Sequence, residues 1–258
     1  ALRGAIPAAL GQVTNWWLIA EGGSYEDLFS AASPLQHLWS LAIEVQFYLV
    51  IPLLVAVLMG PAKLGPVRLA GWLGVAAGVG AIWMIVVTQQ GNSLGRAYYG
   101  TDTRAAELLV GCALGALSAG ARGATHDRLH SFLEGRWLQL LGAAGLVWWL
   151  VTVASAELGD AWLWNGGSTG LAVAAGLAVM ASAQIGSPME RVLSLRWLAW
   201  VGHISYTWYL VHWPVFVWLD GTDWGLDGAG LTAVQLVASL LIALAVHELI
   251  DEPIRTRA

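Results

Sequence analysis

The feature that most constrains this chain is a series of long, nearly uninterrupted apolar runs. A helix needs roughly 20 apolar residues to cross the hydrocarbon core of a bilayer. Backbone inside lipid must satisfy its own hydrogen bonds, which leaves helices or closed barrels, and these runs lack the ten-residue alternation of barrel strands. The sequence therefore predicts an all-α membrane protein, a polytopic helical bundle with seven transmembrane helices. The predicted spans lie at about residues 38–59, 67–88, 101–120, 137–154, 168–186, 196–219 and 229–250.

The composition agrees with a membrane protein. Of 258 residues, 57% are hydrophobic and 11% are charged, whereas soluble domains carry about 25% charged residues. The chain has 31 Gly and 16 Trp; Gly is tolerated in transmembrane helices and Trp gathers at membrane interfaces. The net charge is −5 and the basic residues are scattered, so the sequence excludes a nucleic-acid partner and predicts the lipid bilayer as a partner instead.

Residues 1–37 differ from the rest. Asn15-Trp16-Trp17 precedes a polar stretch that contains Glu26 and Asp27. We interpret this part as the tail of an earlier element, an interfacial tryptophan anchor and an extracytoplasmic loop. Short linkers follow, so residues 38–258 are predicted to form one transmembrane domain. The chain begins with Ala1 and shows no signal-peptide pattern, which leads us to expect that an N-terminal part is missing.

Charge asymmetry predicts the orientation of the chain. Cytoplasmic loops of membrane proteins carry an excess of Lys and Arg. Alternating the seven spans places nine of the 12 basic residues on one side and three on the other. The C-terminus falls on the basic side, so it is predicted to be cytoplasmic in a multi-pass protein of the cell membrane. The nine are Lys63, Arg68, Arg122, Arg128, Arg136, Arg191, Arg196, Arg255 and Arg257, and the three are Arg3, Arg96 and Arg104.

The first predicted span carries a polar stripe. His37, Ser40, Glu44 and Tyr48 recur at helical spacing and share one face. A charge at mid-membrane costs roughly 2.5–3.5 kcal/mol, so such residues usually face a cavity or a partner. A His–Glu pair can orient an imidazole or share a proton. It can equally be a structural pair that stabilises helix packing, and the spacing leaves both interpretations open.

The third predicted span opens with Asp102, Arg104 and Glu107. Arg104 and Glu107 are i,i+3 neighbours, so we expect them to pair. Asp102 suits an N-terminal cap or a first-turn acid. Arginine is suited to bidentate capture of a carboxylate or phosphate, and equally to an interfacial anchor.

The sixth predicted span places Ser205, Tyr209 and His212 on one face, just before Pro214. A histidine there either lines a functional cavity or is a satisfied core group, and its intramembrane position favours the former.

In the last span, His247 and Glu248 lie near the cytoplasmic interface, and we interpret both as structural. Pro253 is predicted to end this helix. The sequence has no Walker A, GxSxG or HExxH motif and no cluster with metal-ligand spacing, so no metal is predicted.

Four segments resemble the acyltransferase-3 family. Residues 33–49 resemble its signature H-x-W-S-L-x-x-E-x-Q-F-Y-L, and residues 96–104 look like a second family segment around Tyr-Tyr-Gly-Thr-Asp-Thr-Arg. Residues 202–214 resemble a third, G-x-[IV]-S-Y-x-x-Y-L-x-H-x-P, and Glu252-Pro253 with Arg255 matches the end of the family's membrane domain. The segments keep the family's order over nearly the whole chain. Val45 departs from the pattern, because many members have a second acidic residue there.

The resemblance implies an integral-membrane O-acyltransferase with ten spans. Such enzymes move an acyl group, usually acetyl from acetyl-CoA, to a hydroxyl. It implies acyl-CoA as the donor substrate, no bound cofactor, and a carbohydrate or lipid-linked glycan of the cell envelope as the acceptor; the oligomeric state stays open. The family's catalytic histidine follows an Arg or Lys by ten intervening residues in the first span. This chain has no counterpart to that motif, so we expect it to be inactive alone.

The resemblance and the polar stripes together nominate site residues. We expect Glu44 to orient or stabilise the family's histidine, and His37 to act beside it, so these two are the candidate catalytic residues. The candidate substrate-binding residues are Ser40, Tyr48, Arg104, Tyr209 and His212. Two rival functions are a non-catalytic, partner-dependent remnant and a membrane transporter. A transporter would more often show internal repeats and paired broken helices, which the sequence does not display.

Overall fold

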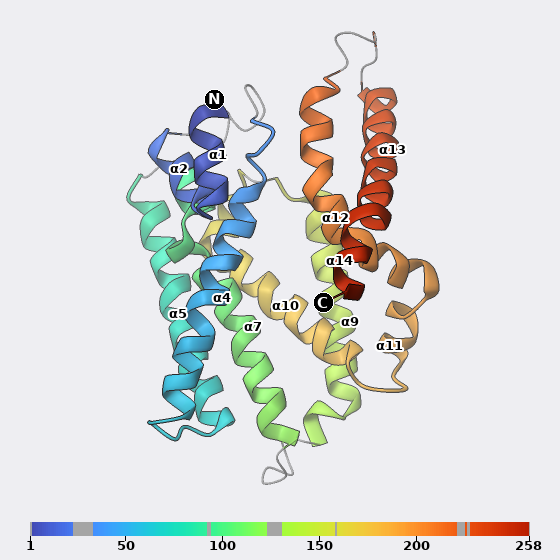
Figure 1. Ribbon diagram of the computed structural model, residues 1–258. Helices are drawn as coiled ribbons and strands as arrows, with labels where there is room; N and C mark the ends of the chain where they lie inside the picture. The colour runs from blue at the N-terminus through green and yellow to red at the C-terminus, as the bar shows by residue number, and fades with distance from the viewer. Residues whose placement is uncertain are drawn as a thin grey trace. The chain divides into compact units, whose positions relative to one another are not determined.

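The computed structural model describes residues 2–22, 33–91, 94–122, 131–157, 159–220, 225 and 228–257. Every regular element in these ranges is a helix (Figure 1), which confirms the all-α prediction for this part of the chain. The chain divides into two compact units. The first combines Ala1–Ala42 with Ser194–Ala258, and the second is Ile43–Leu193.

The second unit is built from pairs of packed helices. Helix α5 packs against α7, and α9 packs against α10, which also contacts α7. Figure 1 shows α5 and α7 as long neighbouring helices. The helices are α4 (Leu38–Met59, which begins in the first unit), α5 (Pro66–Gln89), α6 (Leu94–Tyr99), α7 (Thr101–Arg122), α9 (Arg136–Ser155), η1 (Leu163–Gly167), α10 (Ser168–Ser182) and α11 (Pro188–Leu193).

Small residues allow α9 and α10 to approach closely. A Cβ atom on Gly142 would lie 2.5 Å from Ala181 Cβ, and one on Gly145 would lie 2.7 Å from the Ala174 carbonyl oxygen. Ala174 and Ala181 are buried. Close contact through Gly and Ala is typical of transmembrane interfaces.

The first unit pairs α12 (Arg196–Trp218) with α13 (Gly228–Val246), which lie side by side in Figure 1. The chain continues through η2 (His247–Asp251) and α14 (Glu252–Arg257). Residues 1–37 contribute two short helices that the sequence did not predict, α1 (Leu2–Leu10) and α2 (Thr14–Ala20). Trp16 in α2 is exposed, whereas Asn15 is fully buried. The predicted loop with Glu26 and Asp27 lies outside the described residues.

The prediction that Pro253 ends the last helix is wrong. Pro253 lies in the first turn of α14, and the helical path continues to Arg257. A proline is tolerated there because the first turn of a helix leaves its N–H groups unpaired. The π-helical turn η2 immediately before it provides that local change in hydrogen-bond register.

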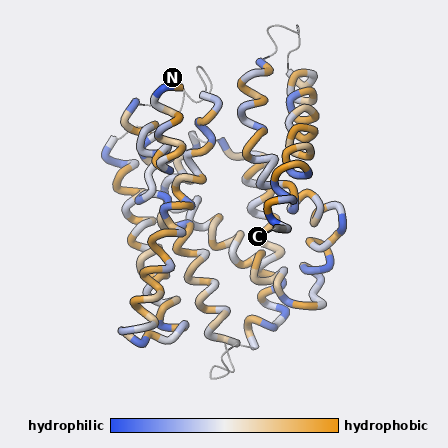
Figure 2. Tube along the Cα trace, viewed as in Figure 1, coloured by the Kyte–Doolittle hydropathy of each residue, from blue (hydrophilic) through white to orange (hydrophobic). Residues whose placement is uncertain are grey.

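In the part of the chain that the structure describes, five helical stretches are long and apolar enough to cross a membrane, so the chain is a multi-pass membrane protein. They are Leu38–Met59, Pro66–Gln89, Leu94–Ala121, Arg136–Ser155 and Gly228–Thr256. Hydrophobic residues cover most of α13 in Figure 2, and many apolar side chains on these helices are exposed, such as Leu53 and Val75. Helix α10 has 15 residues, and α12 carries polar residues along its 23. The count of seven spans therefore stays a prediction.

Candidate functional site

The first unit gathers four of the nominated side chains into one cluster. We call His37, Ser40, Tyr209 and His212 the histidine–tyrosine cluster. The Tyr209 hydroxyl donates to the His37 carbonyl oxygen and lies 2.6 Å from Ser40 Oγ. Residues before and at the start of α4 thus meet the middle of α12, far away in the sequence.

The two imidazoles of this cluster have defined tautomers. Nε2 of His37 lies 3.2 Å from the Leu210 carbonyl oxygen, and Nδ1 of His212 lies 2.6 Å from the Tyr209 carbonyl oxygen. A carbonyl oxygen only accepts, so each of these nitrogens carries the proton. In a neutral ring the other nitrogen keeps its lone pair. The ring centroids of His37 and His212 are 5.7 Å apart, so the cluster holds two imidazoles close together.

Burial keeps His37 neutral. The side chain is buried, and this desolvation, with a smaller contribution from the charge of His212, lowers the pKa of His37 from 6.5 to about 4. Carbonyl oxygens of Leu210 and Pro34 partly oppose the shift. Nδ1 makes no hydrogen bond of normal geometry with the described residues. His37 at neutral pH is therefore a hydrogen-bonding base and not a cation.

Glu44 and Tyr48 do not join the histidine–tyrosine cluster. Glu44 is half-buried on α4 and makes no hydrogen bond or ion pair with another described residue. Tyr48 is 70% exposed. Of the polar stripe predicted along α4, His37 and Ser40 at its start contact α12. Glu44 and Tyr48 in the later turns do not belong to this cluster.

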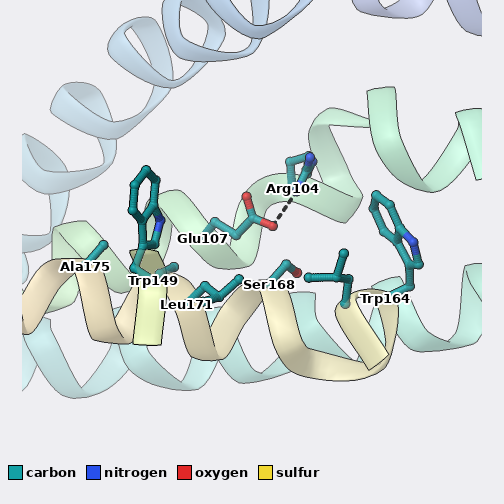
Figure 3. A pocket seen from close by; sticks show the side chains of 9 residues that line it. Arg104, Glu107, Trp149, Trp164, Ser168, Leu171 and Ala175 are labelled. Atoms are coloured by element: carbon teal, nitrogen blue, oxygen red, sulfur yellow. Dashed lines mark hydrogen bonds and ion pairs between the residues drawn. The ribbon is translucent and has the colours of Figure 1, made fainter. Parts of the chain in front are cut away.

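A second site lies within the second unit and centres on Arg104. We call it the arginine pocket, a cavity of about 270 Å³. Figure 3 shows Arg104 and Glu107 joined by an ion pair, with Trp149 and Trp164 on either side of them in this view. The lining residues are Arg104, Glu107, Trp149, Leu163, Trp164, Ser168, Leu171, Ala172 and Ala175.

The Arg104 guanidinium is held from several directions. Nη1 donates to Glu107 Oε1 at 2.7 Å and Nε donates to the Tyr98 carbonyl oxygen at 3.1 Å. Its central carbon lies 5.1 Å from the Tyr98 ring centroid and 5.5 Å from that of Trp164, within cation–π range. The predicted Arg104–Glu107 pair is confirmed. The pocket therefore presents a fixed cation beside a carboxylate, among mainly apolar side chains.

The corner between α6 and α7 positions Arg104. Arg96 binds Asp102 through two hydrogen bonds of 2.9 and 2.6 Å, and Trp83 Nε1 donates to the same carboxylate at 2.7 Å. Gly100 separates the two helices, and a Cβ there would meet Arg96, Thr103 and Asp102 side-chain atoms. Asp102 lies in the first turn of α7 as predicted. Its pairing with Arg96 was not predicted, although both belong to the second family-like segment.

Trp149, Trp164 and Ser168 were missed in the sequence analysis. Trp164 is 2% exposed and lies in η1, within what the sequence suggested was a loop. Gly166 adopts φ 103° there, a conformation that favours glycine and lets the chain turn from η1 into α10. Only the unusual density of tryptophans around this linker could have signalled a buried role.

Comparison with known proteins places these sites in a family. The acyltransferase-3 family, described as an acyltransferase domain, matches residues 4–248. The chain belongs to the acyltransferase-3 family. The match includes the histidine–tyrosine cluster and the arginine pocket, so both sites lie within the region that defines the family.

Several named bacterial proteins align with nearly the whole chain. YrhL of Bacillus subtilis is 34% identical over 99% of this chain and 40% of its own length. A peptidoglycan O-acetyltransferase, OatA, of Listeria monocytogenes is 32% identical over 98% of this chain and 40% of its own. The O-acetyltransferase OatA of Staphylococcus aureus is 31% identical over 97% and 41%. The chain thus spans about two fifths of the length of these relatives. No solved structure matches the chain.

Proposed function

We propose that this chain belongs to an integral-membrane O-acetyltransferase that transfers an acetyl group from acetyl-CoA to a hydroxyl of a cell-wall carbohydrate. The observation that carries the proposal is the family match over residues 4–248. Two relatives that align over nearly the whole chain are named O-acetyltransferases, one of them for peptidoglycan. That name supports a polysaccharide of the cell wall as the acceptor.

The histidine–tyrosine cluster suits the acceptor side of this reaction. A hydroxyl becomes a nucleophile when a positioned base removes its proton. Neutral His37 keeps one lone pair, His212 lies beside it, and the Tyr209 hydroxyl fixes the backbone of His37. We assign acceptor binding to this cluster. Glu44 is a half-buried carboxylate on α4. We assign to it the orientation or stabilisation of the family's catalytic histidine, for which this chain has no counterpart.

The arginine pocket suits part of the donor. Its volume of about 270 Å³ lies just below the roughly 300–1,000 Å³ of sites that take whole drug-sized ligands. We therefore assign to it one end of acyl-CoA. Arg104 would contact an anionic or strongly polar group, while Leu171 and Ala175 would contact apolar atoms. Charge asymmetry of the loops predicts a cytoplasmic C-terminus and places Arg104 on the opposite side. A donor that arrives from the cytoplasm would therefore have to extend across the membrane to reach this pocket.

Radiolabelled acetyl transfer tests this proposal. Membranes that contain the protein carrying this chain are incubated with labelled acetyl-CoA and purified peptidoglycan. The expected product is an alkali-labile acetyl ester on the carbohydrate, formed only when the protein is present. Carbohydrate flux across vesicles without ester formation would overturn the proposal and favour a transporter.

A further inference from the structure

Two histidines and a carboxylate meet in the first unit, away from the histidine–tyrosine cluster. His203 lies on α12, His247 begins η2 and Glu252 begins α14. One ligand atom from each lies within 4.8 Å of the others. The rings of His203 and His247 have centroids 4.9 Å apart, and His203 Nε2 is 3.9 Å from Glu252 Oε2.

Asp251 fixes the tautomer of His247. His247 is 4% exposed, and its Nδ1 lies 2.9 Å from Asp251 Oδ2. A carboxylate accepts, so in the neutral ring Nδ1 carries the proton and Nε2 keeps the lone pair. A carboxylate behind a histidine is the arrangement that orients metal-ligating imidazoles and raises their basicity. Asp251 therefore prepares His247 Nε2 to bind a cation.

One carboxylate oxygen of Glu252 lacks a hydrogen-bond donor among the described residues. This atom, Oε2, is buried and accepts no hydrogen bond from the described residues. His203 at 3.9 Å and Arg255 at 4.0 Å are its ion-pair neighbours, and both distances are too long for hydrogen bonds. A buried carboxylate oxygen without a donor is destabilising, and a bound cation would remove that cost.

The π-helical turn η2 brings His247 and Glu252 to the same side of the helix. Residues five apart, such as His247 and Glu252, do not face each other in an α-helix. The extra residue in a π-turn changes that register, and such turns are frequent at functional sites. The spacing of the two residues therefore gave no metal signal in the sequence, and the third donor is contributed by a different helix.

We propose that His203, His247 and Glu252 bind one zinc-type divalent ion, with Asp251 as a positioning residue. Two imidazoles and one carboxylate form a known set of three protein ligands for zinc, with water in the fourth position. Zinc–ligand bonds of roughly 2.0–2.2 Å require the donors to draw together. The His203 and Glu252 side chains are 48% and 43% exposed, which leaves them room to do so. The ion would tie α12 to the end of the last helix, and this role does not depend on acyl transfer.

Calorimetric titration of the chelator-treated, detergent-purified chain with Zn²⁺ tests the proposal. One equivalent should bind, and Co²⁺ in its place should give the visible absorption of a tetrahedral site. His203→Gln and His247→Gln should each abolish stoichiometric binding. Asp251→Asn should weaken the affinity about 10–100-fold, as loss of such a partner usually does. Glu248→Gln is the matched control, because Glu248 is the exposed neighbour of His247, and its affinity should be unchanged.

His203→Gln keeps the test interpretable if His247→Gln misfolds. His203 is half exposed, so its replacement leaves the packing between α12 and α13 intact, which circular dichroism would verify. Absence of stoichiometric Zn²⁺ binding to the unmodified chain would overturn the proposal. Unchanged affinity in folded His203→Gln would also overturn it, because the ion would then reside on other histidines.

Discussion

His37 shows how burial at a single residue sets a chemical state. Its buried position favours the neutral ring and lowers the pKa of His37 to about 4, although the hydrogen bond to the Leu210 carbonyl oxygen partly opposes this shift. The sequence placed His37 on a polar stripe but gave no sign that its main partners would come from α12. That information is carried by tertiary packing, which helical spacing alone does not encode.

The lowered pKa of His37 predicts a pH-dependent stability. The unfolded chain takes up the proton near pH 6.5 and the folded chain near pH 4. Between pH 6.5 and pH 4 the unfolded state therefore binds more protons than the folded state. The contribution of neutral His37 to the free energy of unfolding is fully present above pH 6.5 and is lost as the pH falls toward 4. The thermal midpoint in detergent should fall over this range, and less so in His37→Gln. Parallel pH curves for the two proteins would contradict this assignment.

Loss of the Tyr209 hydroxyl should slow acetyl transfer more than loss of the Tyr206 hydroxyl on the same helix. Tyr209→Phe removes the contacts to Ser40 and the His37 carbonyl, at about 1 kcal/mol of stability for each lost hydrogen bond. We expect acetyl transfer to slow about tenfold, which corresponds to 1.4 kcal/mol. Tyr206→Phe is the control because Tyr206 is 59% exposed. Equal rates in the two variants would remove Tyr209 from the acceptor site.

Glu107 should restrain the affinity of Arg104 for an anionic donor. Glu107→Gln leaves the Arg104 charge without its partner at 2.7 Å, so an anionic group of the donor would meet less competition. We expect a lower KM for acetyl-CoA in Glu107→Gln and a higher KM in Arg104→Gln. If KM is the same in both variants and in the unmodified protein, the arginine pocket is not a donor site.

At the scale of helices, hydrophobic length predicted the long helices well. The predicted spans 38–59 and 67–88 correspond to Leu38–Met59 and Pro66–Gln89, because lipid imposes a strict length on apolar runs. The helices α1 and α2 were missed since they are too short for that signal. The turn η2 was missed because a π-turn depends on local hydrogen bonding that hydropathy does not report.

The α9–α10 interface gives a test at this scale. Gly142→Leu should displace α10, since even a Cβ would lie 2.5 Å from Ala181 Cβ, and overpacking typically costs about 1–3 kcal/mol. Gly74→Leu is the matched control, because nothing lies within 4 Å of a Cβ built there. The yield of monodisperse protein and its thermal midpoint should fall only for Gly142→Leu. A similar result for both variants would argue against close packing at Gly142.

At the scale of the whole molecule, the orientation in the membrane follows from charge. Nine of the 12 basic residues are predicted to lie on the side of the C-terminus. A green fluorescent protein fused after Ala258 should therefore fluoresce, because this reporter fluoresces in the cytoplasm. Alkaline phosphatase at the same position should be inactive, because it is active only outside the cytoplasm. The reverse pattern would invert the proposed topology and the direction of donor entry.

The sequence motifs identified single residues of the candidate sites, but they did not show which of these residues meet in the folded units. The motif around residues 33–49 contains His37 and Ser40, and the motif around 202–214 contains Tyr209 and His212. The structure brings these four side chains together, and their roles stay predictions. The partnership between these motifs required the fold of the first unit. The arginine pocket depends on η1 and α10 as well as α7, and those segments carry no motif.

Acetyl transfer by Glu44→Gln tests the central claim most directly. The initial rate of ester formation on peptidoglycan would be measured in membranes that contain equal amounts of folded protein. Glu21→Gln serves as the control because Glu21 is an exposed acid outside α4. If Glu44 stabilises a histidine that becomes charged, Glu44→Gln should be at least about 100-fold slower, within the range of positioned acid–base groups. A normal rate in Glu44→Gln would contradict the proposed site and exclude Glu44 from the reaction.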